Sequence, residues 1–394
     1  MKKAIVIGYG VSSLGVIRSL GLKGLQVASM YYDKTDFSHT SKYVYEGIQV
    51  PSPNRGEREF IYTLIKHADR WKGSLVFDTD DAVTVAISRH RRELGEFYTV
   101  VTSGWEVVRR FIEKKETYRI AKKCDVPYPM TLFPNSLDEL EEIKDKIEYP
   151  CILKPVRVHE FARRFNSKNF KVDNYDQLLS KFILSLETGH EVMVQEIIPG
   201  PPGNMDNYTV YVNTNGDVGA RFHRLKVRQN PPQFGITRVG ISHDRILEVE
   251  EFTEKLLREA GFRGIATAEF KRDPRDNRFK LLEVNARTIR SNWLSTYCGV
   301  NFPWIAYLDL AEGKQIDVKD YRKNVYWIDL NADIYNLTFR RSQENLGIKD
   351  FLKPYLARDK SFSVLSLDDP RPFLTEIATL PIRQYRLFRS GSYE

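Results

Sequence analysis

The residues with the clearest chemical potential are two glutamates in a predicted β-hairpin. Residues 267–271 and 279–287 are alternating runs on either side of a turn-forming segment rich in Asp, Pro and Asn. With an even register about that turn, Glu269 lies opposite Glu283 or one pair away. Because side chains alternate along a strand, both carboxylates point to the same face of the hairpin. The sequence therefore predicts that the two acids converge.

This convergence requires a compensating charge. Like charges on adjacent strands repel, so Glu269 and Glu283 need a cation or a basic side chain between them. Mg2+ takes one or two protein carboxylates among hard oxygen ligands, so Glu269, Glu283 and the Asn285 carbonyl are candidate metal ligands. A solvated face with the glutamates paired to Lys271 or Arg287 is the alternative. Alternation places Thr267, Asn285 and Arg287 on the carboxylate face, and Phe270, Leu282 and Val284 on the apolar face.

Three shorter motifs precede the hairpin. A Glu-Lys-Lys-Glu-Thr-Tyr run is followed by Val-Pro-Tyr-Pro within residues 113–129, and Lys154 ends the apolar strand predicted over 151–155. A further strand ends in a Pro-Gly turn within residues 194–200. In this order and spacing, followed by the carboxylate hairpin, the motifs resemble those of the ATP-grasp superfamily over roughly residues 105–310.

The resemblance extends to the carboligase-like branch of that superfamily, which includes D-aspartate ligases. Nearly the whole chain takes part in it. The segments that are similar to this branch are Gly8-Tyr9-Gly10, Ser41-Lys42-Tyr43, Thr79-Asp80-Asp81, residues 228–235 and residues 368–372.

The resemblance implies a nucleotide held between two α+β subdomains, with ATP and Mg2+ as cofactors, two metal ions as an option and Mn2+ as a substitute. Phosphoryl transfer depends chiefly on positioning and on cations near the reacting oxygens, in agreement with the residues found. The implied phosphate and acyl-phosphate contacts are Lys114 or Lys115 at the α-phosphate, Lys154 at the α- and β-phosphates, and Arg287 at the γ-phosphate or acyl phosphate. The implied hinge for adenine is Gln195, Glu196, Ile197 and Ile198, with Asp206 at the ribose and Glu269, Glu283 and Asn285 at Mg2+.

One departure from the family pattern concerns the flap. Many ATP-grasp enzymes have a glycine-rich flap after the strand lysine, whereas residues 156–170 contain no glycine. A basic loop could instead close over the triphosphate through its side chains, and an ordinary charged surface loop is the alternative. The basic residues of this loop are Arg157, Arg163, Arg164 and Lys168.

A second basic run, residues 221–228, is predicted to be a strand. Alternation places Arg224, Lys226 and Arg228 on one face. Three like charges there would suit the γ-phosphate or a carboxylate substrate, and Arg228 is therefore a candidate catalytic residue. A solvated strand face is the alternative.

The elements that position these residues divide the chain into an α/β part and an α+β part. Strands at 4–7, 26–31 and 74–77 with intervening helices predict an open, Rossmann-like parallel sheet. The resemblance implies that this sheet is the pre-ATP-grasp domain and that the later strands form a two-subdomain ATP-grasp fold. The expected domains are residues 1–104, the small subdomain with a linker helix at 105–200, the central subdomain at 201–318, and a C-terminal extension at 319–394.

Two other functions compete with this reading. The turn Gly8-Tyr9-Gly10 after the first strand could bind a pyrophosphate and define a nicotinamide-dependent oxidoreductase, but the next glycine, Gly15, falls at the wrong spacing. A non-catalytic binder of anionic partners would use the basic runs alone.

Composition limits the remaining classes. The chain has 394 residues, a net charge of +8 and three cysteines without metal-ligand spacing, which favours a multidomain protein of a reducing, cytoplasmic compartment. No run of about 20 apolar residues predicts a membrane span. Residues 151–172 carry six basic and one acidic side chain, and residues 221–228 carry four basic side chains and no acidic one, so the positive charge is local.

The expected function is an ATP-dependent ligase. A substrate carboxylate would attack the γ-phosphate of Mg-ATP, and an amine would displace the resulting acyl phosphate to form an amide. An amino acid is the expected acid or amine, and both substrates would be small molecules rather than nucleic acid. Since this chemistry needs no protein nucleophile, the absence of a recognisable Ser-His-Asp or Cys-His arrangement agrees with it.

Overall fold

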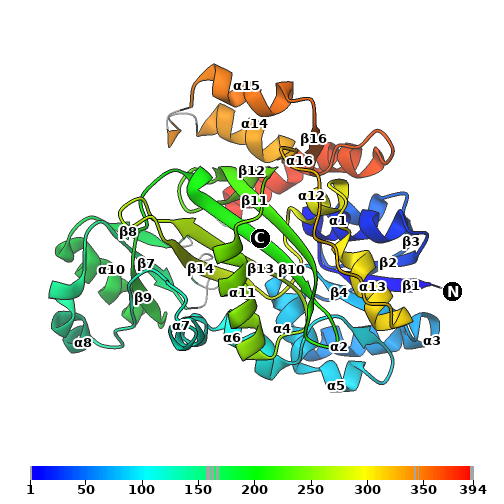
Figure 1. Cartoon of the computed structure of the whole chain (residues 1–394), viewed down its shortest axis with the longest axis horizontal. Helices are drawn as coiled ribbons and strands as arrows, with labels where there is room; N and C mark the ends of the chain where they lie inside the picture. Colours follow the sequence, from blue (N-terminus) through cyan, green and yellow to red (C-terminus); the bar gives the residue numbers. More distant parts are fainter. Residues whose placement is uncertain are drawn as a thin grey trace.

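Three β-sheets organise the chain (Figure 1). The structure, a computed structural model, describes residues 2–156, 161, 164–165, 167, 169–340, 343–344 and 346–390, with the backbone alone over 383–390. In the view of Figure 1, a small sheet lies at the left, a large sheet in the middle, and the N-terminal sheet at the right. The described helices include none with the length and apolarity needed to cross a bilayer.

The N-terminal sheet is open and fully parallel, as expected, with the order β3-β2-β1-β4-β5. Alternate residues of its central strand enter different cores: Ala4 and Val6 pack with α1, and Ile5 and Ile7 pack with α2 and α4. Both faces are therefore covered, which explains the unbroken apolar sequence of this strand. The strands are β1 (Lys3–Ile7), β2 (Gln26–Tyr31), β3 (Val44–Gln49), β4 (Leu75–Asp78) and β5 (Thr99–Val100), and the helices are α1 (Gly10–Gly21), α2 (Glu57–Lys66), α3 (Ala68–Trp71), α4 (Asp81–Arg89) and α5 (Arg91–Leu94).

The linker helix that was expected after this sheet is divided into two helices. α6 (Trp105–Ile112) and α7 (Lys114–Lys123) are separated at Glu113, whose backbone is extended. The break makes Lys114 the first residue of α7 rather than a mid-helix residue, so its side chain starts from the end of the helix.

The small sheet has four strands in the order β6-β9-β7-β8. Lys154 pairs with Met193 in antiparallel register, which places the lysine beside the strand that contains Gln195. Two helices cover one face of this sheet over a core that includes Leu153, Leu178 and Val194. The strands are β6 (Thr131–Leu132), β7 (Cys151–Pro155), β8 (Phe170–Val172) and β9 (Val192–Glu196), and the helices are α8 (Leu137–Glu142) and α10 (Tyr175–Glu187).

The central sheet has seven strands in the order β14-β13-β10-β11-β12-β15-β16. α11 covers one face over Tyr208, Ala268 and Phe270, while α12 and α13 join the central sheet to α1 of the N-terminal part. The strands are β10 (Met205–Val212), β11 (Val218–Asn230), β12 (Ile236–Ser242), β13 (Gly264–Arg272), β14 (Phe279–Asn285), β15 (Tyr326–Ile328) and β16 (Lys360–Phe362), and the helices are α11 (Leu247–Ala260), α12 (Asn292–Tyr297) and α13 (Phe302–Glu312).

The register of the β13–β14 hairpin confirms that Glu269 lies directly opposite Glu283. One detail of the prediction is wrong. A β-bulge follows this pair, so that Phe270 is opposite Leu281 instead of Leu282. Leu281 is fully buried in the apolar core and Leu282 is only partly buried, because the extra residue of a bulge shifts the alternation beyond it.

The C-terminal segment is joined to the central sheet. β15 pairs with β12, and α14 (Leu330–Phe339) contacts β11 and β12, with α15 (Ile348–Leu356) beside it in Figure 1. α16 (Arg371–Ser390) contacts Ser38–Thr40 of the N-terminal part. The buried carboxylate of Asp333 on α14 accepts from Arg228 Nη2 of β11, Arg238 Nε of β12 and the Tyr355 hydroxyl of α15, each at 2.7 Å. This carboxylate connects two strands with both C-terminal helices.

We predict that Asp333→Ala lowers the free energy of unfolding by about 3 to 5 kcal/mol, because it leaves the buried Arg228 guanidinium without its counter-ion and removes one of the two carboxylates, Asp333 and Glu344, that Arg238 contacts. Denaturant titration of the purified variant measures this. Asp320→Ala, which removes an exposed carboxylate, is the matched control and should change stability by less than about 0.5 kcal/mol. Equal stabilities of the two variants would contradict the structural role of Asp333.

Candidate functional site

Five charged side chains from five elements converge where the small sheet faces the central sheet. Lys114 begins α7, Lys154 lies on β7 and Lys226 on β11, while Glu269 and Glu283 come from the hairpin. Lys226 Nζ is 3.0 Å from Glu269 Oε1. The charges of the other four members all affect the pKa of Lys154. Three lysines and two glutamates thus form one group of interacting charges, hereafter the lysine–glutamate cluster.

Lys154 has a lowered pKa. Burial and the neighbouring charge of Lys114 lower its pKa to about 8, although Glu283 and Glu269 oppose the shift. A lysine in this state keeps its proton at neutral pH but has lost much of its solvation, so an anion that approaches it gains more than it would in water.

Gln195 fixes the position of Lys154. Its side chain is fully buried, and its Oε1 accepts from Lys154 Nζ at 2.7 Å. Its Nε2 donates to the Tyr118 hydroxyl and to Thr131 Oγ1, each at 2.8 Å. The amide therefore connects β7, β6 and α7, and its role is to orient the lysine. The sequence did not reveal this role, nor that of Tyr118, although Tyr118 closes the lysine-containing motif at 113–118.

Glu196, Ile197 and Ile198 follow directly as the end of β9 and the segment beyond it. The Glu196 carboxylate accepts from the Met130 backbone N–H at 2.9 Å and pairs with Arg275 at 2.7 Å and Lys280 at 3.3 Å. The carbonyl of Ile198 accepts from Lys271 Nζ at 2.7 Å. Side chains of the hairpin therefore hold this segment in place from both ends, while its backbone passes beside the cluster.

The structure separates the two lysines that the sequence left as alternatives. Lys114 acts on both Lys154 and Glu283 and belongs to the cluster. Lys115 is exposed, pairs with Glu191 and lies 5.4 Å from the centre of the Phe133 ring. Consecutive residues at the start of a helix point about 100° apart, so only one of them can face the cluster.

The hairpin oxygens suit a hard divalent cation. Glu269, Glu283 and Asn285 lie on one face, and Asn285 Nδ2 donates to Glu283 Oε1 at 3.2 Å. Desolvation opposes the ionisation of Glu283, but Lys114, the Asn285 amide and Lys226 lower its pKa, so it is an anion at neutral pH. Two ionised carboxylates and an amide oxygen are the donor set that Mg2+ prefers. Lys226 is the side chain that occupies this face next to Glu269.

Arg287 links the hairpin to the N-terminal part. Its Nε and Nη2 donate to the two carboxylate oxygens of Asp81 at 2.6 and 3.0 Å, and Asp81 begins α4. Desolvation by burial opposes its charge, but Asp81 and Asp80 raise its pKa, and Glu283 contributes in the same direction. The guanidinium is therefore fixed at the edge of the cluster. Asp81 as its partner was not predicted, although residues 79–81 stand out in the sequence.

The basic run on β11 does not act as one face. Arg224 lies on the cluster side, where its Nη1 donates to Thr237 Oγ1 at 2.8 Å and its Nη2 donates to Asn207 Oδ1. Arg228 instead donates to Asp333 and lies 5.0 Å from the centre of the Phe351 ring. A register irregularity between Lys226 and Arg228 turns the strand. The structure therefore does not bring Arg228 together with the cluster, because the bulge changes the alternation on which that expectation depends.

Asp206 also lies elsewhere. Its neighbour Asn207 is paired with Glu269, so alternation directs Asp206 to the opposite face of the sheet, against α11. There its fully buried carboxylate accepts from His223 Nδ1 at 2.9 Å and His243 Nε2 at 2.6 Å.

These three side chains are, among the described residues, the group of His, Cys, Asp and Glu with donor atoms close enough for a metal ion, all within 4.8 Å of one another. The second nitrogen of His223 lies 3.1 Å from Glu250 Oε1, and Arg245 holds that carboxylate. Although burial opposes its charge, Asp206 and Glu250 raise the pKa of His223. The group is a closed ion-pair network behind the sheet.

The glycine turn of the N-terminal sheet does not present a free anion site. The Gly10 backbone N–H at the start of α1 donates to Asp36 Oδ1 at 2.6 Å. A Cβ on Gly8 would lie 2.0 Å from Thr79 Oγ1 and 3.0 Å from Asp80 Oδ2, so these two side chains leave room only for a glycine. Two carboxylates occupy the place where a pyrophosphate would bind, so the geometry disfavours the nicotinamide alternative.

The basic loop after Lys154 falls partly outside the described residues. Arg157, Arg163 and Lys168 are not described, and neither is His159. Arg164 is exposed. The side-chain flap expected there stays a prediction.

Comparison with known proteins was made by sequence and by structure. No protein-family model matches the chain. A curated relative, the D-aspartate ligase of Enterococcus faecium (strain Aus0004), is 26% identical over 365 residues, which cover 86% of this chain and 85% of that protein.

Solved structures with the same fold include three enzymes or enzyme domains. The L-amino acid ligase from Bacillus licheniformis is 17% identical, with a TM-score of 0.61, and covers 80% of this chain and 75% of that one. The N5-carboxyaminoimidazole synthetase from Staphylococcus aureus, complexed with ADP, is 17% identical, with a TM-score of 0.65 and coverage of 87% and 88%. The biotin carboxylase domain of the Hydrogenobacter thermophilus 2-oxoglutarate carboxylase, complexed with MgADP, is 18% identical, with a TM-score of 0.65 and coverage of 82% and 73%.

The fold and the likeness to these proteins define the class: the chain has the ATP-grasp fold, which it shares with these solved structures. In sequence, the chain is similar over most of its length to the E. faecium D-aspartate ligase. The resemblance to ATP-grasp proteins that was read from the motifs is thus confirmed.

We predict that Gln195→Met raises the ATP concentration needed for half-maximal activity about tenfold, because Lys154 loses the acceptor that orients it and hydrogen bonds to charged groups contribute about 1.5 to 3 kcal/mol. Steady-state kinetics with ATP as the varied substrate measures this. Gln177→Met on the exposed face of α10 is the matched control. Unchanged ATP dependence in Gln195→Met would remove the positioning role.

Proposed function

We propose that this protein is an ATP-dependent carboxylate–amine ligase that forms an amide bond through an acyl phosphate, with an amino acid as one substrate. The observation on which this depends most is the lysine–glutamate cluster, which combines cations for a triphosphate with oxygen ligands for its metal. The D-aspartate ligase and L-amino acid ligase relatives support the reaction class.

The proposed reaction has two displacements. An oxygen of the substrate carboxylate attacks the γ-phosphorus of ATP, the bond from that phosphorus to the β–γ bridging oxygen breaks, and ADP leaves. The nitrogen of the amine then attacks the acyl carbon, the bond from that carbon to the phosphate oxygen breaks, and phosphate and a proton are released. Neither step requires a covalent bond to the protein.

The proposed roles of the side chains follow from their places. Lys154 and Lys114 neutralise the phosphate oxygens, since both are cations in the cluster. Arg287 faces the γ-phosphate or the acyl phosphate with a guanidinium that Asp81 keeps oriented. Preorganised cations of this kind lower the barrier to phosphoryl transfer because they need not reorganise during the reaction.

Glu269, Glu283 and Asn285 are the proposed ligands of Mg2+, which when bound neutralises and orients the phosphate oxygens. The MgADP complex of the biotin carboxylase domain supports the nucleotide and the metal. A second ion at the two carboxylates, and substitution by Mn2+, belong to the same proposal. Lys226 would then share Glu269 with the metal.

The rest of the proposal concerns the hinge, the partners and the setting. The backbone at Glu196, Ile197 and Ile198 is the proposed adenine-reading segment, and residues 105–200 and 201–318 are the proposed subdomains on either side of the nucleotide. The proposed partners are a small carboxylate and a small amine. The free cysteines Cys124, Cys151 and Cys298 support a reducing, cytoplasmic setting.

The proposal does not retain Lys115, Arg228 and Asp206 as site residues, since their side chains face away from the cluster.

The direct test is ADP release from Mg-ATP in the presence of candidate amino acids, with and without an amine partner. We predict release that requires both substrates and falls at least a hundredfold in Lys154→Ala and in Glu283→Ala, because each removes a charge from the cluster. Lys146→Ala, an exposed lysine of the small subdomain, is the matched control.

Full activity in both cluster variants would show that the cluster is not the active site. Dependence on NAD instead of ATP would replace the proposed reaction with that of an oxidoreductase.

The pH dependence gives a second test. Since the pKa of Lys154 is about 8, we predict that the affinity of the free protein for Mg-ATP falls about tenfold between pH 8 and pH 9.5, as this lysine loses its proton. Calorimetric titration over this pH range measures it. Lys154→Arg should keep a nearly flat profile because a guanidinium stays charged. A flat profile in the unmodified protein would exclude Lys154 as the titrating contact.

A further inference from the structure

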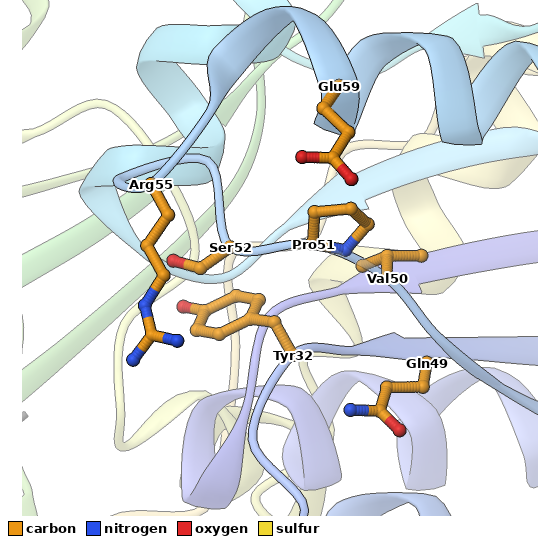
Figure 2. A pocket seen from close by; sticks show the side chains of 7 residues that line it. All are labelled: Tyr32, Gln49, Val50, Pro51, Ser52, Arg55 and Glu59. Carbon is orange, nitrogen blue, oxygen red and sulfur yellow. The ribbon is translucent and has the colours of Figure 1, made fainter.

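A pocket of about 460 Å3 opens at the carboxyl edge of the N-terminal parallel sheet. Tyr32 follows β2, and Gln49 to Ser52 end β3 and continue beyond it, so the pocket lies where those two strands stop. Arg55 and Glu59 complete it from the loop before α2 and from α2 itself (Figure 2). In open parallel sheets, ligands bind outside the carboxyl ends of the strands, and this volume is within the range of small-molecule sites.

The two charged side chains of the pocket are unpaired. Arg55 and Glu59 have opposite charges and are four residues apart, a spacing that often forms an ion pair on a helix. Within the described part of the chain, neither side chain has an ion-pair or hydrogen-bond partner, and each is exposed. By contrast, Arg58, which precedes Glu59 on α2, pairs with Glu93 at 3.1 Å. A cationic and an anionic side chain thus line one pocket with their charges available to a ligand.

The pocket is connected to the proposed active site through Tyr32. The Tyr32 ring lines the pocket, and its hydroxyl donates to Asp80 Oδ2 at 2.6 Å. The next residue, Asp81, holds the guanidinium of Arg287 at the edge of the lysine–glutamate cluster. A molecule that lies against Tyr32 is therefore linked to Arg287, the proposed γ-phosphate contact, through Asp80 and Asp81.

We propose that this pocket binds the amino acid substrate as a zwitterion, with its α-carboxylate on Arg55 and its ammonium group on Glu59. The inference rests on the proposed ligase function and adds to it the place and chemistry of substrate recognition. Arg55 provides a planar fork that matches a carboxylate, and Glu59 is an acceptor-only group that matches an ammonium ion. Because the α-carboxylate and the ammonium group are held, the group that reacts with ATP is the substrate's side-chain carboxylate, which these contacts leave free.

Substrate discrimination follows from this arrangement. A zwitterion satisfies both charges of the pocket, whereas a simple acid leaves Glu59 facing a carboxylate and a simple amine leaves Arg55 without a partner. An amino acid should therefore bind more tightly than the analogues that lack one of its two charges.

The test measures binding of D- and L-aspartate to the full chain by calorimetry, without nucleotide and with Mg2+ and a non-hydrolysable ATP analogue. Succinate, which lacks the ammonium group, and ethylamine, which lacks both carboxylates, are the matched probes. We expect at least one aspartate enantiomer to bind tenfold or more tightly than either probe. Arg55→Gln should weaken aspartate binding tenfold or more. In Glu59→Gln, aspartate and succinate should bind with similar affinity.

Arg58→Gln and Glu96→Gln are the controls, since they remove one cation and one anion from the surface outside the pocket. They should bind aspartate like the unmodified protein, and melting temperatures should show that all four variants fold. Failure of both enantiomers to bind, or unchanged binding in Arg55→Gln and Glu59→Gln, overturns the inference. Amino-acid-dependent ADP release that both variants retain would leave the ligase function in place and exclude this pocket. Pocket-dependent binding without ADP release would do the reverse.

Discussion

The constraint on which the rest of the structure depends is the placement of Glu269 directly opposite Glu283. Two carboxylates in this register repel unless positive charge lies beside them. The fold supplies that charge from three separate elements: Lys226 from the same sheet, Lys154 from the small sheet and Lys114 from the start of α7. The central sheet, the small sheet and the connecting helices therefore meet at one electrostatic cluster, and their relative positions decide whether the acids are stabilised.

A buried polar network supports this cluster from behind. Gln195 uses its carbonyl for Lys154 and its amide nitrogen for Tyr118 and Thr131, so no rotation of the amide preserves all three bonds. On the other side of β9, Glu196 is fixed by hairpin cations. Fully satisfied networks of this kind specify one arrangement, because any alternative leaves a buried group unbonded. The nucleotide-facing surface proposed here is thus preorganised by groups that do not themselves need to touch the nucleotide.

The outer parts of the chain are joined to the centre by individual ion pairs. Asp81 of the N-terminal part holds Arg287, and Asp333 of the C-terminal helices holds Arg228 and Arg238. These contacts explain why Arg287 and Arg228, which were both candidate site residues from the sequence, lie in different places. Arg287 stays at the edge of the cluster, while Arg228 is directed into the interface with the C-terminal helices. The positive charge that the composition concentrates on β11 is divided in the same way between the cluster and structural ion pairs.

Local patterns in the sequence determined the parallel N-terminal sheet, the β13–β14 hairpin with its facing glutamates, and the lysine that ends β7. Each depends on alternation or apolar runs over a few residues, which the chain itself specifies. Only the tertiary structure decided between Lys114 and Lys115, directed Asp206 to the far face, and gave Gln195 its role. It also placed Leu281 rather than Leu282 in the core and directed Arg228 away from the cluster. Both outcomes come from bulges, which shift the alternation of side chains and depend on the strand pairing. These outcomes depend on contacts between residues far apart in the chain, which no local pattern contains.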